Sequence, residues 1–188
     1  MKKVLITLAL LGLGAAIAFH YYDPDFSSLV DASSGDNGPI ADIDRPLPHA
    51  VLPLADGNWV DLSSYKGQVV LISFWTTWCP GCVDEVPTLM HLQDEFGPKG
   101  FTVVGVAVDD QGDESVESFI SKERFNLSGT PSAINYQIAM GNDDVNRELG
   151  FEGGLPMGIL VNRDGKEVKI IRGTVSEAAL SKAIRKLL

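Results

Sequence analysis

The chain has 188 residues, of which 45% are hydrophobic and 21% are charged, and its formal net charge at pH 7 is −10. This acidic balance argues against nucleic acid as a partner and against attraction to anionic lipid headgroups. The length accommodates one compact domain behind an N-terminal leader, and the sequence shows no internal repeat.

Residues 1–22 have the pattern of an export signal. Two lysines precede an uncharged apolar run that extends from residue 4 to residue 19. Such a run is typical of a secretory signal peptide or a signal anchor. Ala16-Ile17-Ala18 fits the small-x-small cleavage pattern, whereas the uncut run to Tyr22 would be roughly long enough to span a bilayer. Both alternatives place the following residues outside the cytoplasm.

Residues 23–45 are dominated by Asp, Ser, Gly and Pro and contain few large apolar side chains. A segment of this composition cannot bury a hydrophobic core, so we expect a flexible tether here. The folded domain is then expected over residues 46–188.

Within 46–188, strand and helix patterns alternate. The sequence predicts a hairpin over 50–62, a buried strand over 69–75 and a helix over 80–96 that Gly97-Pro98 closes. It further predicts, in chain order, a strand over 101–108, a helix over 115–124, a short strand over 132–136, a short helix over 143–149, a hairpin over 157–171 and a last helix from Ser176 to Leu188. This order indicates a three-layer α/β/α sandwich with a mixed sheet.

The only two cysteines, Cys79 and Cys82, stand where the strand over 69–75 passes into the helix. Positions three apart are neighbours on a helix, so a disulfide can open and close between them with little backbone movement. Cys79 is expected at the N-cap with Pro80 as the first helical residue. The helix amides and dipole then favour a thiolate at Cys79, and the thiolate is the form that attacks disulfides. We therefore expect a redox pair with an exposed, attacking Cys79 and a shielded Cys82.

Two other uses of the cysteine pair are less favoured. A structural disulfide would close a loop so short that it restricts the unfolded chain little. A zinc half-site would need further ligands, but there is no second cysteine pair, and His20, His49 and His91 show no paired spacing. We therefore expect no metal and no cofactor apart from the redox-active disulfide.

Glu85 is expected to act on the proton of Cys82. Counting about 100° per residue from Cys82, the apolar side chains of the helix form one arc, and Glu85 falls inside it between Leu92 and Phe96. A carboxyl group in this place loses hydration, its pKa rises, and it can exchange a proton with the thiol. The alternative is that Glu85 reaches the edge of the arc and stays solvated.

Over residues 46–188 the chain resembles the thioredoxin superfamily, and more narrowly its exported TlpA/ResA/DsbE-like branch. The resemblance is carried by Phe74-Trp75-x-x-Trp78-Cys79-x-x-Cys82, the leading hairpin, an extra strand–helix segment at about 129–149, and Gly154-Leu155-Pro156 before a strand. It implies a thioredoxin-like fold with an N-terminal β-hairpin and a central strand–helix insertion.

The resemblance also implies how a substrate would bind. It implies a cis peptide at Leu155–Pro156 that faces the dithiol, with the backbone of Leu155 pairing with a substrate strand. Trp78 and Pro80 are implied to contact the substrate as well. Pro131 is the other proline that follows a glycine-containing turn, but nothing after it has the pattern of the terminal hairpin and helix.

Two positions depart from cytoplasmic thioredoxins. Ser73 occupies the place of their buried aspartate, whereas this branch carries its acid three residues after the second cysteine, where Glu85 stands. The dipeptide between the cysteines is Pro80-Gly81 instead of Gly-Pro, and a leading proline is shared with strong periplasmic oxidants. The direction of the redox reaction therefore stays open at this point.

The resemblance implies a thiol:disulfide oxidoreductase in the periplasm or on the extracytoplasmic face of the cytoplasmic membrane. The favoured activity is reduction of protein disulfides such as the Cys-x-x-Cys-His segments of apocytochrome c. The implied partners are these proteins and a membrane electron donor of the DsbD/CcdA type, with the membrane touched only through the N-terminal segment.

A dithiol oxidase or isomerase is the main alternative. A thiol peroxidase is less favoured, because Thr76-x-x-Cys79 matches its threonine and cysteine but Ile72 stands where its proline is expected. A copper carrier is less favoured as well, because such carriers use a Cys-x-x-x-Cys spacing.

Overall fold

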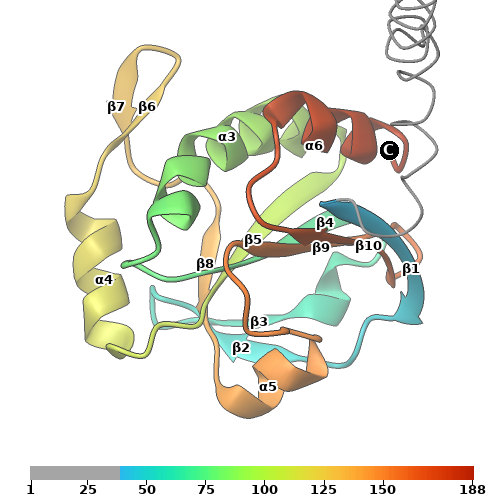
Figure 1. Cartoon of the computed structure of the whole chain (residues 1–188), viewed down its shortest axis with the longest axis horizontal. Coiled ribbons are helices and arrows are strands. Elements are labelled where there is room, and N and C mark those ends of the chain that lie inside the picture. Colours follow the sequence, from blue (N-terminus) through green and yellow to red (C-terminus); the bar gives the residue numbers. More distant parts are fainter. Residues whose placement is uncertain (1–38) are drawn as a thin grey trace, which may run out of the picture. The chain divides into compact units, whose positions relative to one another are not determined.

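The computed structural model describes residues 39–188 (Figure 1). The expected leader over 1–22 and most of the expected tether lie outside the described residues. Within 39–188, no helix is both long and apolar enough to cross a membrane.

A six-stranded mixed sheet forms the centre of the domain. Its strands in spatial order are β1 (Ile40–Pro46), β10 (Lys166–Arg172), β9 (Met157–Val161), β4 (Val69–Trp75), β5 (Phe101–Ala107) and β8 (Gln137–Met140). β4, β5 and β8 run parallel, whereas β9 is antiparallel to β4, β10 to β9, and β1 to β10. β4 is buried at every position, as its nearly continuous apolar sequence predicts.

Two layers cover the sheet, which confirms the three-layer sandwich. Helices α3 (Pro80–Phe96) and α6 (Glu177–Arg185) lie on one face, and α5 (Asp143–Glu148) lies on the other with the hairpin of β2 (Val51–Pro53) and β3 (Trp59–Asp61) (Figure 1). Alternate side chains of β4 enter the two cores. Leu71 packs in the cluster of α3 and α6 that contains Leu92 and Leu180, whereas Ile72 packs in the opposite cluster with Leu52.

Short elements complete the domain. A 3-10 turn, η1 (Leu62–Tyr65), follows β3, and another, η2 (Gly97–Lys99), follows α3 where the helix was expected to end. Helix α4 (Asp113–Lys122) begins and ends two residues earlier than expected. It packs Phe119 against Trp75 at the end of β4, with the ring centroids 5.5 Å apart.

The folded domain begins before residue 46, so the expected boundary between tether and domain is wrong. Residues 40–46 form β1, an edge strand in which Ile40 is paired with Ile171. The charged side chains of β1 form ion pairs with β10: Asp42 with Lys169, Asp44 with Lys166 at 3.1 Å, and Arg45 with the fully buried carboxylate of Glu167. An edge strand can carry such charges because its outer side faces solvent.

The expected strand over 132–136 is wrong. Instead, β6 (Phe125–Leu127) and β7 (Thr130–Ser132) form a separate hairpin, and the sheet strand β8 follows at 137–140. Ser128 and Gly129 both have positive φ, as the tight turn of a two-residue hairpin requires. The expected helix over 143–149 is confirmed as α5, and the expected terminal hairpin is confirmed as β9 and β10. The last helix, α6, ends at Arg185, three residues before the expected end.

Candidate active site

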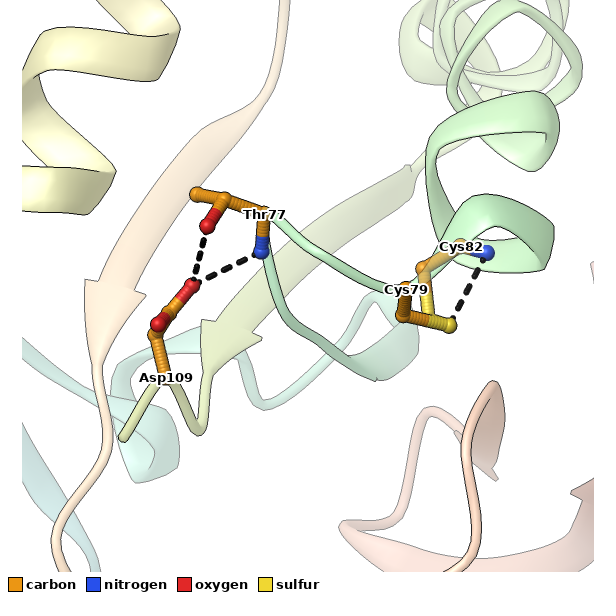
Figure 2. The surroundings of a disulfide bond; sticks show 4 residues. All are labelled: Thr77, Cys79, Cys82 and Asp109. Carbon is orange, nitrogen blue, oxygen red and sulfur yellow. Dashed lines mark hydrogen bonds between the residues drawn. A yellow bond between two sulfur atoms is a disulfide. The ribbon is translucent and has the colours of Figure 1, made fainter. Parts of the chain in front are cut away.

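The junction between β4 and α3 holds the two cysteines as the sequence predicts. Cys79 is the N-cap of α3, with an extended backbone, and Pro80 is the first residue of the helix. The backbone amide of Cys82 donates a hydrogen bond to the sulfur of Cys79 at 3.3 Å (Figure 2). The sulfur therefore receives a helix N-terminal N–H, which stabilises a thiolate when the pair is reduced.

The structure holds the oxidised form of this pair. Cys79 and Cys82 are joined by a disulfide, and their Cα atoms are 5.3 Å apart (Figure 2). Cys79 is 8% exposed and Cys82 is 3% exposed. Cys79 is thus slightly more exposed than Cys82, as predicted, but the difference is small. Cys79 is nearly buried, whereas the sequence predicted an exposed residue. The neighbouring residue Trp78, directly before Cys79, is 51% exposed.

Pro156 lies against Gly81, the residue directly before Cys82. The Leu155–Pro156 bond is the one cis peptide within residues 39–188. A Cβ atom at Gly81 would lie 3.6 Å from Cδ of Pro156 and 3.4 Å from Oγ1 of Thr174, so both residues pack on the first turn of α3. A groove at this place is lined by Glu152, Gly154, Leu155, Pro156, Met157, Arg172 and Gly173. Pro131, in contrast, is exposed in β7.

Glu85 lies on α3 one turn after Cys82 and is largely withdrawn from solvent. It lines a small cavity between α3 and the sheet together with Ser73, Leu71 and Leu89. Burial raises the pKa of Glu85 from 4.5 to about 7. Glu85 is thus partly buried against the sheet, as its position in the apolar arc predicts. A group with this pKa can both give and take a proton near neutral pH.

Tyr136 is a neighbour of Glu85 that the sequence did not single out. Burial raises the pKa of its hydroxyl, and the negative charge of Glu85 raises the pKa further. Its ring and the indole nitrogen of Trp75 both lie beside Gly105, where a Cβ atom would be 3.2 Å from each. Tyr136 was expected to end a strand, and nothing in its local sequence indicates that it approaches Glu85.

Two aspartates after β5 hold the segment that precedes the cysteines, and the sequence did not predict their role. Asp109 accepts hydrogen bonds from the backbone and hydroxyl of Thr77 at 2.8 and 2.6 Å (Figure 2). Partial burial acts to raise the pKa of Asp109, but the hydrogen bonds from Thr77 and Gln111 outweigh it and hold the pKa below its usual range. Asp110 accepts a hydrogen bond from the indole of Trp78 at 2.8 Å.

The pKa of Glu85 predicts how stability depends on pH. The folded domain retains the Glu85 proton up to about pH 7, whereas the unfolded chain loses it near pH 4.5. This group's contribution is therefore complete below about pH 4.5 and is lost as the pH rises through about 7, on the order of 3 kcal/mol in total. Glu85→Gln cannot ionise, so the oxidised variant should unfold at higher denaturant concentration than the parent at pH 8 and at a similar concentration at pH 4.

Urea unfolding of the oxidised parent and of Glu85→Gln at several pH values measures this difference. Glu117→Gln is the matched control, because Glu117 is exposed on α4. If the stability of Glu85→Gln relative to the parent is the same at pH 4 and at pH 8, Glu85 is not buried with a raised pKa.

The arrangement is suited to thiol–disulfide exchange. It combines a disulfide at a helix N-terminus, an acid that titrates near neutral pH one turn away, and a cis proline next to a groove. Among residues 39–188, no three or more His, Cys, Asp or Glu side chains are grouped so that they could hold a metal ion.

Comparison with known proteins agrees with this chemistry. The Redoxin family profile matches residues 42–187. The thiol-disulfide oxidoreductase ResA of Geobacillus thermodenitrificans is 32% identical over 181 residues, which cover 94% of this chain and 93% of that protein. ResA of Bacillus subtilis is 28% identical over 171 residues, covering 91% of this chain and 85% of that protein.

A solved structure gives the same assignment. The crystal structure of a thiol:disulfide interchange protein of the thioredoxin family from Chlorobium tepidum superposes with a TM-score of 0.64 at 25% identity. The match covers 77% of this chain and 97% of that one. The chain belongs to the Redoxin family, in the TlpA/ResA/DsbE-like branch of the thioredoxin superfamily, and is a thiol:disulfide oxidoreductase.

Proposed function

We propose that this protein is an exported reductase of protein disulfides, with Cys79 as the attacking sulfur. The observation that carries the proposal is the partly buried Glu85, which lies one helical turn after Cys82 and lines a small cavity with Ser73, with its pKa raised to about 7 by burial. Such a group can take the proton of the Cys82 thiol as a general base while the disulfide forms, and return it to the Cys82 thiolate when the disulfide is reduced again.

The reaction transfers two electrons from the protein to its substrate. The Cys79 thiolate attacks one sulfur of the substrate disulfide, the substrate S–S bond breaks, and the released substrate thiolate takes up a proton. Glu85 then removes the proton of Cys82, whose thiolate attacks the Cys79 sulfur in the mixed disulfide. The Cys79–Cys82 disulfide forms, and the second substrate thiolate leaves and is protonated.

The substrate would bind as an extended segment along the cis proline. Within residues 39–188, the amide and the carbonyl of Leu155 take part in no hydrogen bond, and Leu155 lines the groove at the cis proline. A substrate strand could pair with these two groups, as in β-augmentation, while Trp78 and Pro80 contact the residues around its cysteine. Segments of the type Cys-x-x-Cys-His in apocytochrome c suit this mode, which would place the protein in cytochrome c maturation.

The reductase needs a supply of electrons. We propose a membrane donor of the DsbD/CcdA type, which reduces the Cys79–Cys82 disulfide on the extracytoplasmic side. The export pattern of residues 1–22 supports a location in the periplasm or on the outer face of the cytoplasmic membrane.

One observation favours oxidation or isomerisation as a second candidate. Pro80 stands directly after the attacking cysteine, as in strong periplasmic oxidants, and it occupies the first position of α3. A strong oxidant needs a very stable Cys79 thiolate, and a buried acid one turn beyond Cys82 does not provide this stabilisation. We therefore place reduction first.

Trapping in cells tests the proposed substrates. Cys82→Ala leaves Cys79 able to attack but removes the sulfur that resolves the mixed disulfide, so substrate proteins should accumulate in covalent complexes that thiol reagents release. The double variant with both cysteines replaced by alanine is the control and should capture nothing. Complexes that contain apocytochrome c support the maturation role. If Cys82→Ala captures no more protein than the double variant, the proposal is wrong.

A further inference from the structure

The segment between β4 and the cysteines is held by the carboxylate of Asp109, and both of its oxygens accept hydrogen bonds. Oδ2 of Asp109 accepts the amide of Thr77 at 2.8 Å and its hydroxyl at 2.6 Å (Figure 2). Oδ1 of Asp109 accepts the amide of Gln111 at 3.0 Å, which fixes the carboxylate relative to its own loop. Asp109 thus links two loops that are 32 residues apart in the chain.

This segment has few other backbone hydrogen bonds. It comprises residues 76–78, between the last residue of β4 and the N-cap Cys79. Its backbone has one long hydrogen bond, 3.4 Å from the Cys79 amide to the Thr76 carbonyl. The shorter hydrogen bond from the Val108 amide to the Trp75 carbonyl lies before this segment, at the end of the β4–β5 pair. The two bonds from Thr77 to Asp109 are therefore the main hydrogen-bond anchors of the three residues that set where Cys79 begins the helix, beside the packing of the buried Thr76 side chain.

The next residue, Asp110, acts on a side chain instead of the backbone. It accepts the indole N–H of Trp78 at 2.8 Å, although the Trp78 side chain is half exposed. A single hydrogen bond at the polar edge of an exposed ring restricts its rotamers and leaves its apolar surface free for contact. The ring is thereby fixed directly before the attacking cysteine.

We propose that Asp109 and Asp110 are positioning residues of the redox site. Asp109 fixes the backbone that carries Cys79, and Asp110 fixes the indole of Trp78 as a contact surface for the substrate chain. The proposal rests on the proposed function in taking Cys79 as the attacking sulfur. The two adjacent aspartates should therefore differ in their effects, whereas a general role in folding would affect both reactions in the same way.

Two substrates of different size test this division. With oxidised glutathione, Asp109→Ala should slow the attack by reduced protein about tenfold, because two hydrogen bonds to the loop are lost. Asp109→Asn keeps an oxygen that can accept from Thr77 and should restore most of the rate. Asp110→Ala should react with oxidised glutathione within about twofold of the parent, but its KM for a peptide with an internal Cys-x-x-Cys disulfide should rise about fivefold.

The controls separate positioning from stability and from the proposed function. Asp94→Ala removes an exposed acid from α3 and should leave both reactions unchanged. Thr77→Val removes only the 2.6 Å bond and should slow the glutathione reaction about threefold, which keeps the test decisive if Asp109→Ala does not fold. In the same assay, activity retained by Cys79→Ser would refute the proposed function whatever the aspartate variants do.

The outcomes that overturn the proposal are specific. If Thr77→Val and a folded Asp109→Ala both react with oxidised glutathione at the parent rate, Asp109 does not position Cys79. If Asp110→Ala leaves the peptide KM unchanged, or slows both substrates equally, Asp110 does not act through Trp78.

Discussion

Replacing Cys79 with serine is expected to abolish disulfide reduction, with a fall in rate of about a thousandfold or more, because the attacking sulfur is lost. Cys82→Ser should still attack once and then stop at the mixed disulfide. The reduced variants are mixed with oxidised glutathione, the reaction is quenched with acid, and mass spectrometry of the intact protein distinguishes them. The glutathione adduct should form on Cys82→Ser and should be absent from Cys79→Ser.

Alkylation of the reduced parent tests the same assignment without a substitution. The Cys79 sulfur receives the helix amide of Cys82 and is the more exposed of the two, so it should be modified first near neutral pH. The difference in exposure is small in the oxidised form, so the selectivity must come mainly from the thiolate. Preferential labelling of Cys82 would reverse the two roles.

Glu85→Gln is expected to slow resolution of the mixed disulfide by about a hundredfold, the lower range of general acid–base catalysis. In the parent, this step should accelerate as the pH rises through about 7, because the carboxylate form of Glu85 takes the proton of Cys82. The variant lacks this ionisation, so its rate should follow only the titration of the thiols.

Single-turnover kinetics of the reduced protein between pH 5 and 9, with the thiols titrated in parallel, measure this effect. Asp84→Asn is the matched control, since Asp84 is exposed one residue earlier on the same helix. If Glu85→Gln and the parent share one pH profile and one thiol titration, Glu85 does not relay the proton, and its burial affects stability alone.

The elements that carry the cysteines could be predicted from the sequence because their signals are local. The apolar run of β4 and the cap and stop residues of α3 define both elements to the residue. The place of Glu85 follows from helix periodicity in the same way. Strand β1 could not be predicted, because Asp42 and Asp44 are neutralised by lysines of β10 more than a hundred residues later in the chain.

The second part of the site depends on contacts that the sequence does not encode locally. Asp109 was not expected to hold Thr77, although parallel strands β4 and β5 bring their carboxyl ends to one edge of the sheet. That topology is the signal that could have found it. Tyr136 was placed in a strand that does not form, because the turn at Ser128-Gly129 was not recognised as a separate hairpin.

The reduction potential of the Cys79–Cys82 pair tests the proposed reductase most directly. Equilibration of the described domain with glutathione buffers, followed by quantification of the oxidised fraction, gives this value. In the proposed mechanism Glu85 accepts the proton of Cys82, and within residues 39–188 the hydrogen bond to the Cys79 sulfur comes from the Cys82 amide at 3.3 Å. The potential should therefore fall nearer to about −270 mV, as in thioredoxin, than to about −120 mV, as in a strong oxidant. A value above about −180 mV would contradict the account and make this chain an oxidase or isomerase.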